Sequence, residues 1–143
     1  MFNITIKYFG FLKHIPLLPH LFDSFMKISI LFSNKHTLDY IDEIENEVLS
    51  WNNTTVHLHK FGGIQFDVNK KEIGHIHSNG ILDILFSREI KTQLIKQGKA
   101  TEHHTIKNSG WITLHIKTDE DKITAIQLLR DSYSRKFTSP SPL

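Results

Sequence analysis

The sequence predicts a single α+β domain in which helices cover one face of an antiparallel β-sheet, with a helical extension at the N-terminus. Short segments of alternating apolar and polar residues, separated by Gly- and Asn-rich turns, indicate strands joined as hairpins. Amphipathic segments flank these strands and indicate helices that bury one side. The chain of 143 residues, 39% of them hydrophobic and 22% charged, has the size and composition of one globular domain.

Three properties of the composition limit the classes of function. The chain has no cysteine, which excludes disulfides, thiolate zinc sites and cysteine nucleophiles. It contains no run of about 18 apolar residues and no signal-peptide pattern, so we expect a cytoplasmic protein without a transmembrane segment. The net charge of +2 is too small to indicate nucleic-acid binding by itself, and the ten histidines would add positive charge on mild acidification.

Residues 1–36 differ from the rest of the chain and are expected to form a hydrophobic extension. Within them, residues 17–32 predict a helix that is apolar on more than one side and therefore needs a cover. Two interpretations are open: the helix packs on the domain, or it forms a homodimer contact or a membrane-surface anchor. The domain itself is expected over residues 37–137, followed by a disordered Ser- and Pro-rich tail over 138–143.

The domain is expected to begin with a helix and four strands. Thr37 is a suitable N-cap for a helix over Leu38–Trp51, whose apolar residues recur at helical spacing. The four strands are predicted over Thr55–Lys60, Ile64–Val68, Glu72–His77 and Ile81–Phe86. Gly62-Gly63 lacks the neighbours of a phosphate-binding loop and is expected to form a turn or bulge.

Two helices and two strands are expected in the second half. Ser87 is expected to cap a helix that runs to about Gln97 and is closed by Gly98. Strands are predicted over His103–Ile106 and Trp111–Lys117. A capping box that begins at Thr118 opens the last helix.

His75-Ile76-His77 is the most informative motif of the chain. Alternate side chains of a strand share a face, so both imidazoles are expected on one side, with Cα atoms roughly 7 Å apart. The hairpin that follows sets their neighbours. A three-residue loop with Gly80 at positive φ pairs His75 with Asp83 and Ile76 with Leu82, and this register keeps the apolar residues on one buried face.

This register predicts a polar sheet face opposite the core. The residues expected inside are Ile64, Phe66, Val68, Ile76, Leu82, Ile84, Phe86, Ile112, Leu114 and Ile116. The residues expected on the polar face are Gln65, Asp67, His75, His77 and Asp83, with Trp111, Thr113 and His115 from the later strand. His57 and His59 also share a face, but the sequence does not fix their direction relative to this cluster.

Three interpretations of the polar face are open. As a site for a divalent metal such as zinc, it would use His75, His77 and a third imidazole from His103, His104 or His115, with His104 preferred; Asp83 would orient a ligand ring. As a metal-free site, a pair formed by His75 and Asp83 would move protons for a bound small molecule. If the face has no function, it is a solvent-exposed polar surface, and its histidines only reflect the composition of the chain, as His14, His20 and His36 do.

Basic residues on and after the middle helix give a weaker signal. They are Arg88, Lys91, Lys96, Lys99 and Lys107. We expect a solvated face, with contact to an anionic ligand as the alternative.

The ordered motifs as a set resemble the small luciferase domain family, also described as a domain of unknown function. The motifs are Phe61-Gly62-Gly63-Ile64-Gln65-Phe66, Glu72-Ile73-Gly74-His75-Ile76-His77, Gly80-Ile81-Leu82-Asp83-Ile84, Glu102-His103-His104, Ser109-Gly110-Trp111 and Leu128-Leu129-Arg130-Asp131-Ser132-Tyr133. The resemblance covers about residues 38–135. It directs interest to the motif positions His75, His77, Asp83, His103, His104, Ser109 and Trp111.

The element order also resembles, more distantly, the YjbR-like and TfoX N-terminal double-wing fold. That resemblance implies an antiparallel α+β domain and a nucleic-acid- or protein-binding alternative. The hypothesis from the residues is a small-ligand site, metal-assisted or acid–base. Its catalytic residues are expected to be His75, His77, Asp83, His103 and His104, and its ligand contacts Asp67, Trp111 and His115, to which the luciferase domain resemblance adds Ser109.

Overall fold

A computed structural model of the chain describes residues 21, 24–25, 35–103 and 105–138. Its sheet has six antiparallel strands in the order β1-β2-β3-β4-β6-β5. The strands are β1 (Thr54–Leu58), β2 (Ile64–Val68), β3 (Lys71–Ile76), β4 (Ile81–Leu85), β5 (Thr101–Glu102) and β6 (Trp111–His115). The helices bounded within this part are α3 (Lys35–Leu49), α4 (Arg88–Lys96) and α5 (Asp119–Phe137). The predicted α+β fold with an antiparallel sheet is confirmed.

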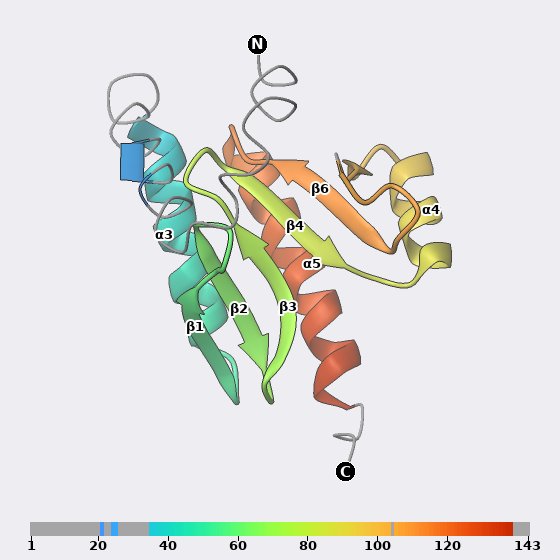
Figure 1. The fold of residues 1–143 in the computed structure, drawn as a ribbon, viewed down its shortest axis with the longest axis horizontal. Coiled ribbons are helices and arrows are strands. Elements are labelled where there is room, and N and C mark those ends of the chain that lie inside the picture. Colours follow the sequence, from blue (N-terminus) through green and yellow to red (C-terminus); the bar gives the residue numbers. More distant parts are fainter. Residues whose placement is uncertain (1–20, 22–23, 26–34, 104, 139–143) are drawn as a thin grey trace.

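Helices α3 and α5 lie together behind the sheet and enclose the hydrophobic core (Figure 1). Helix α3 places Ile44 and Val48 in the core, and α5 contributes Ala125 and Leu129. All four have no exposed surface, as has Phe66 of the sheet. The spacing of three and four residues within each helix explains why one side of each is buried. The other face of the sheet is therefore the side that the two helices leave uncovered.

The hairpin between β3 and β4 has the predicted register. His75 pairs with Asp83, and Ile76 pairs with Leu82. The N–H of Gly80 donates to the carbonyl of His77, and Gly80 has a φ of 79°. Glycine tolerates this left-handed conformation without a Cβ penalty. The hairpin therefore turns the imidazole of His75 and the carboxylate of Asp83 to the same face.

Strand β3 contains a bulge that the alternation did not predict. Phe66 pairs with Gly74, but the next residue, Asp67, pairs with Glu72, so Ile73 is the extra residue in β3. An extra residue shifts the alternation of one strand by one position. Glu72 therefore faces the same side as Asp67 and His75, while the side chain of Ile73 is fully buried. The hydroxyl of Ser132 on α5 donates to the carbonyl of Ile73 at 3.0 Å.

Most predicted helix signals are confirmed, with one correction at α3. Ser87 caps α4, and Gly98 follows it at a φ of 69°. Thr118 forms its capping box with Asp121. Thr37, however, is not an N-cap, because α3 begins at Lys35. Its side chain is instead buried beside the hairpin, where a Cβ on Gly80 would lie 2.9 Å from the Thr37 methyl.

The predicted strand over His103–Ile106 is wrong. The ladder with β6 stops after Glu102. Directly beyond it, Nδ1 of His103 accepts hydrogen bonds from the backbone N–H groups of Thr105 and Ile106, both at 3.2 Å. A side chain that binds its own following backbone competes with strand pairing and favours a turn.

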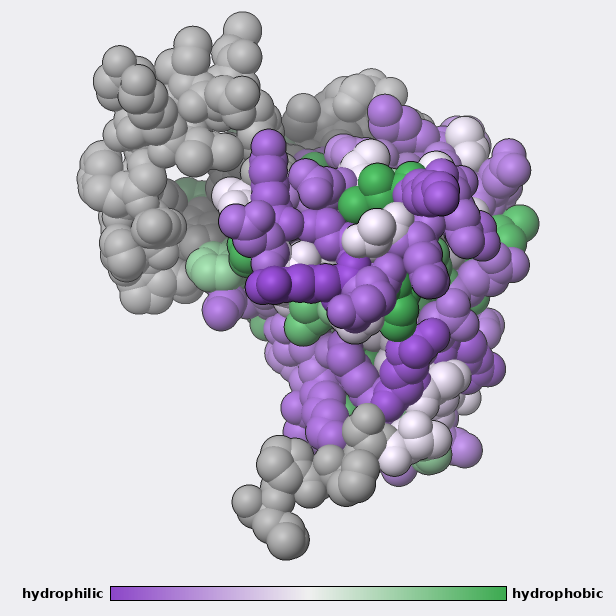
Figure 2. All heavy atoms as spheres, turned by 90° about the vertical axis from the view of Figure 1, so that its right-hand side faces the viewer, coloured by the Kyte–Doolittle hydropathy of each residue, from purple (hydrophilic) through white to green (hydrophobic). Residues whose placement is uncertain are grey.

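The side of the molecule that carries α4 is mostly hydrophilic, with apolar residues in small separate areas (Figure 2). Among the described residues, no helix has the length and apolar character needed to cross a membrane. The predicted helix over 17–32 lies outside the described residues except for Leu21, Ser24 and Phe25, which are helical, and the predicted tail over 138–143 lies outside them except for Thr138. The dimer and anchor interpretations of the N-terminal extension therefore stay predictions.

Candidate functional site

A row of polar residues crosses the face of the sheet opposite α3 and α5. His57 pairs with Gln65, Gln65 with His75, His75 with Asp83, and Asp83 with Thr113. Directly paired residues of antiparallel strands point to the same side, so all five side chains share this face. His75 and Asp83 lie at the centre of the row, and both are buried.

A second row of residues, next to the first, places His59 beside the two predicted histidines, His75 and His77. The N–H of His59 donates to the carbonyl of Gly63, and that of His77 donates to the carbonyl of Ile81. Gly63 has a φ of 80°, and a Cβ on it would lie 3.0 Å from the Cα of His77. A residue without a side chain thus stands between the two histidines. The ring of His59 stacks on that of His75, with centroids 3.9 Å apart and planes 9° from parallel.

His75 lies between two carboxylates. Its Nδ1 is 2.6 Å from Oε1 of Glu72, and its Nε2 is 3.5 Å from Oδ2 of Asp83. Burial favours the neutral ring, but the contacts with Asp83 and Glu72 outweigh burial and raise the pKa of His75. The same contacts lower the pKa of Glu72 and of Asp83 against the effect of burial. The two carboxylates therefore favour the charged form of the His75 ring.

Asp83 is the centre of a second group of contacts. The hydroxyl of Thr113 donates to Oδ1 of Asp83. Oδ2 lies 3.5 Å from Nε2 of His75 and 3.6 Å from Nε2 of His103. Both distances exceed hydrogen-bond length, and Oδ2 is a buried atom without a hydrogen-bond partner in the described part of the chain. A fully buried carboxylate oxygen of this kind is costly unless something compensates it.

His103 is held in one orientation by the turn that it forms. Because Nδ1 accepts backbone hydrogen bonds, the proton of the neutral ring is on Nε2, which faces Asp83. Trp111 lies beside both rings, with centroids 5.2 Å from His75 and 6.1 Å from His103. The indole of Trp111 therefore lies against both imidazoles of this face.

His59 has the opposite electrostatic character to His75. Burial and the neighbouring charge of His75 lower the pKa of His59 to about 4, so its ring is neutral at pH 7. Its Nδ1 is buried and has no hydrogen-bond partner among the residues that the structure describes. A neutral imidazole with an unused nitrogen is the form that binds a metal ion.

His59, His75 and His77 together form a candidate metal centre. One ligand nitrogen from each lies within 4.8 Å of the others. Two of the three are the predicted ligands, and His59 takes the third place. His104, the predicted third ligand, lies outside the described residues. Gly63 was the signal for His59, because it is hydrogen-bonded to His59 and its missing Cβ lets it lie against the backbone of Ile76 and His77.

The other predicted site residues lie around this centre. Asp67 is buried and accepts a hydrogen bond from Gln65 at 2.8 Å, with His57 Nδ1 at 3.8 Å. His115 is exposed and pairs with Ile81, which separates it from His77. Ser109 lies in the loop before β6, where its hydroxyl donates to the carbonyl of Ile106 at 2.6 Å. The structure thus brings Asp67 near the central row and leaves His115 and Ser109 at its periphery.

Lys91 departs from the predicted solvated basic face. It is buried, and its Nζ donates to the carbonyls of Lys107 at 2.5 Å and Ser109 at 3.1 Å. Glu102 Oε1 lies 3.7 Å from the same nitrogen. Lys91 therefore holds the loop that follows His103 and does not belong to an exposed basic face.

Comparison with known families supports the resemblance found from the motifs. Residues 70–132 match the family model described as luciferase domain. The matched segment contains Glu72, His75, His77, Asp83, His103 and Trp111. The match begins after His59, so the third imidazole comes from outside the matched segment. This match does not confirm the double-wing resemblance. Comparisons with curated proteins and with solved structures gave no match.

Proposed function

We propose that this chain, which matches the luciferase domain family over residues 70–132, binds one divalent metal ion of the zinc class through His59, His75 and His77. One observation carries the proposal: the buried Nδ1 of His59 has no hydrogen-bond partner in the described part of the chain, and it belongs to a group of three imidazoles whose ligand atoms lie within 4.8 Å. Native proteins rarely leave a buried polar atom without a partner, so such an atom indicates a missing ligand.

The donor set fits zinc and related borderline metals. Imidazole nitrogen is a common ligand for zinc, copper and nickel, and three protein ligands leave a coordination position for water or substrate. Glu72 bonded to Nδ1 of His75 is the outer carboxylate that often orients a ligating histidine. Because Asp83 and Glu72 raise the pKa of His75, metal binding has to displace a more tightly held proton from this ring, and affinity should rise with pH.

The residues around the centre support acid–base work on a small ligand. A bound zinc ion would polarise a ligand oxygen or lower the pKa of a water molecule. Asp83 and His103 form an adjacent pair that can accept and hold a proton, with Nε2 of His103 directed at the carboxylate. Trp111 limits solvent access on one side. We propose Asp83 and His103 as the proton-handling groups beside the metal, and Trp111 as an apolar ligand contact.

Zinc binding to untagged protein tests the proposal. Competition against a chromophoric chelator should give one zinc per chain. His77→Ala should weaken binding at least roughly tenfold, because His77 is half-buried and its loss removes one ligand. Glu72→Gln should weaken it by about tenfold to hundredfold, because it removes the carboxylate that orients His75.

His57→Ala and His115→Ala are the matched controls, since both histidines are exposed on the same sheet face and lie outside the cluster. Neither change should alter the affinity. Substoichiometric zinc in the native chain, or equal loss in the controls and in His77→Ala, would refute the metal proposal.

A metal-free acid–base site is the second candidate, favoured by Oδ2 of Asp83 lying between two imidazole nitrogens. This candidate predicts that the chain binds no zinc and that His75 titrates well above His59. Histidine NMR titration of the metal-free protein measures both values. Equal midpoints for the two rings would remove this candidate.

A further inference from the structure

Strands β3 and β4 separate beside the histidine site, and helix α5 lies behind the gap. Their ladder ends at the pair formed by His75 and Asp83, and beyond this pair the strands diverge, with α5 visible between them (Figure 1). Gly74 is the next residue of β3, and a Cβ on it would lie 3.0 Å from Cδ2 of Leu129 on α5. The missing side chain therefore lets β3 approach the helix closely, within reach of its polar groups.

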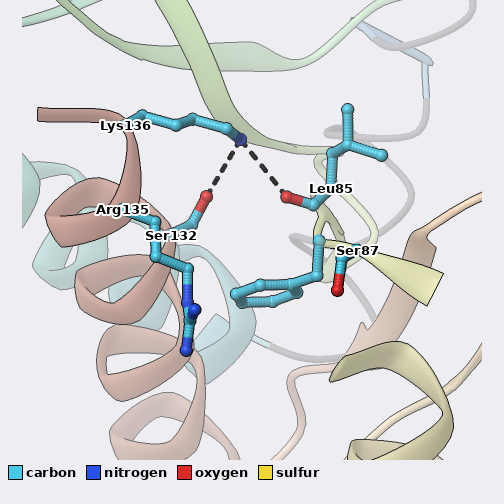
Figure 3. A pocket seen from close by; sticks show the side chains of 6 residues that line it. Leu85, Ser87, Ser132, Arg135 and Lys136 are labelled. Atoms are coloured by element: carbon cyan, nitrogen blue, oxygen red, sulfur yellow. Dashed lines mark hydrogen bonds between the residues drawn. The ribbon is translucent and has the colours of Figure 1, made fainter. Parts of the chain in front are cut away.

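Two side chains of α5 supply hydrogen bonds where the strands no longer pair with each other. The hydroxyl of Ser132 donates to the carbonyl of Ile73 on β3 at 3.0 Å. Lys136 Nζ donates to the carbonyl of Leu85 on β4 at 3.3 Å and to Oγ of Ser132 at 3.0 Å (Figure 3). Ser132 and Lys136, four residues apart on the helix, thus form one hydrogen-bonded link between β3 and β4.

The direction of the hydrogen bonds in this link follows from the chemistry of the two groups. Burial lowers the pKa of Lys136 to about 8, so at pH 7 the amine is mostly an ammonium group, which only donates. Oγ of Ser132 must therefore accept from Lys136, and its single hydrogen is left for the carbonyl of Ile73. Because Ser132 is buried, water is poorly placed to replace this donor if the hydroxyl is removed.

The carbonyl that Ser132 holds belongs to the extra residue of the β3 bulge. Ile73 is skipped in the register with β2, and this turns Glu72 to the face of His75, where its Oε1 lies 2.6 Å from Nδ1 of the ring. In a regular strand Glu72 would face the core instead. The bulge, the acid and Ser132 all lie within the matched segment 70–132. A donor that keeps the bulge in place therefore also keeps the carboxylate beside the histidine.

We propose that Ser132 is a positioning residue for the histidine site: its hydrogen bond to Ile73 maintains the bulge that directs Glu72 to Nδ1 of His75. Lys136 acts one step further away, because it orients the Ser132 hydroxyl. The consequence for metal affinity rests on the proposed function, whereas the consequence for the contact between Glu72 and His75 does not.

Proton NMR of the metal-free chain tests the positioning role without reference to metal. The carboxylate of Glu72 only accepts, so Nδ1 of His75 carries the hydrogen, and in this buried ring it should give a downfield resonance that exchanges slowly with water. Glu72→Gln should remove the resonance and so assign it. Ser132→Ala should raise its exchange rate by roughly tenfold, the effect of losing one hydrogen bond. Lys136→Met, which keeps the aliphatic stem, should act in the same direction but less strongly.

Ser134→Ala is the matched control. The hydroxyl of Ser134 is exposed and donates to the carbonyl of Arg130 within α5 at 2.9 Å, so this change should leave the imidazole resonance unaltered. Circular dichroism of each variant checks folding, and Lys136→Met keeps the test open if Ser132→Ala does not fold. An unchanged resonance in Ser132→Ala would overturn the proposal, as would equal changes in Ser132→Ala and Ser134→Ala.

A double-mutant cycle on zinc affinity separates positioning from a contribution to stability alone. Ser132→Ala should weaken zinc binding by roughly tenfold in the native chain, because His75 loses its orienting carboxylate. In a chain that already carries Glu72→Gln, the same change should have little further effect, since the group that it positions is gone. Equal losses in the two backgrounds would overturn the positioning role. If the native chain binds no zinc, the metal proposal fails, and the imidazole resonance still decides the role of Ser132.

Discussion

The two faces of the sheet are buried by opposite kinds of chemistry. Phe66 on the core face and Asp83 on the polar face both have no exposed surface. Phe66 is stabilised by leaving water, whereas Asp83 loses hydration and depends on Thr113, His75 and His103 for compensation. On the core face, apolar packing by itself makes the burial of Phe66 favourable. On the polar face two atoms, Asp83 Oδ2 and His59 Nδ1, still lack partners in the described chain, and this incompleteness is what indicates a site.

The largest effect is expected from the core face. Phe66→Ala should lower the free energy of unfolding by about 4 kcal/mol, because it removes a fully buried aromatic ring and leaves a cavity under α3 and α5. Urea denaturation followed by circular dichroism measures the change. His77→Ala on the polar face should cost far less, since this ring is half-buried. Comparable losses for the two variants would contradict the contrast between the faces.

A smaller effect is expected on the free energy of unfolding of the metal-free protein at acid pH, and it comes from the polar face. Between pH 6.5 and about 4, His59 takes up a proton in the unfolded chain but not in the folded chain. Unfolding should therefore become easier as pH falls through this window, by a total of about 3 kcal/mol. His75, with a raised pKa, acts in the opposite sense, and its contribution is lost as pH rises above its folded pKa.

His59→Phe isolates the contribution of His59, because it keeps a ring at the stacking position without a titrating group. Urea denaturation at a series of pH values in the presence of a chelator should show a flatter acid limb for this variant than for the native chain. Superimposable acid limbs for the two proteins would show that His59 does not resist protonation.

The smallest effect is expected from the loop that carries His103. Lys91→Met should cost about 1 kcal/mol, because two carbonyls of this loop lose a charged donor. Hydrogen exchange of the amides over residues 103–110 should become faster, while exchange in the core strands changes little. Lys96→Met, on the exposed side of the same helix, is the control. Uniform acceleration across the domain would mean that Lys91 supports the whole fold and not this loop.

The fold was predictable from sequence because its signals are local. Strand alternation, the Gly80 turn and the Thr118 capping box each depend on residues close together in the chain. The register of the central hairpin followed from the requirement that apolar residues share a face. The strand expected at His103 was wrong because a side-chain interaction within the same segment replaced the ladder.

The candidate site was predictable only where it depends on that hairpin. His75 and Asp83 meet as expected. Glu72 was missed because simple alternation turns it inward, and the bulge at Ile73 reverses it. His59 was missed as a member because its direction depends on where β1 ends and on the glycine opposite it. Lys91 was misassigned because its charge indicated solvent, whereas distant carbonyls supply its partners.

The extra residue in β3 has a consequence for how related chains are compared. Glu72 and His75 are three positions apart in the sequence but occupy adjacent places on one sheet face. A relative without the insertion would place the equivalent glutamate two positions before its histidine. An ungapped alignment would then match Glu72 to a residue that faces the core and would report the acid as absent when its spatial counterpart is retained.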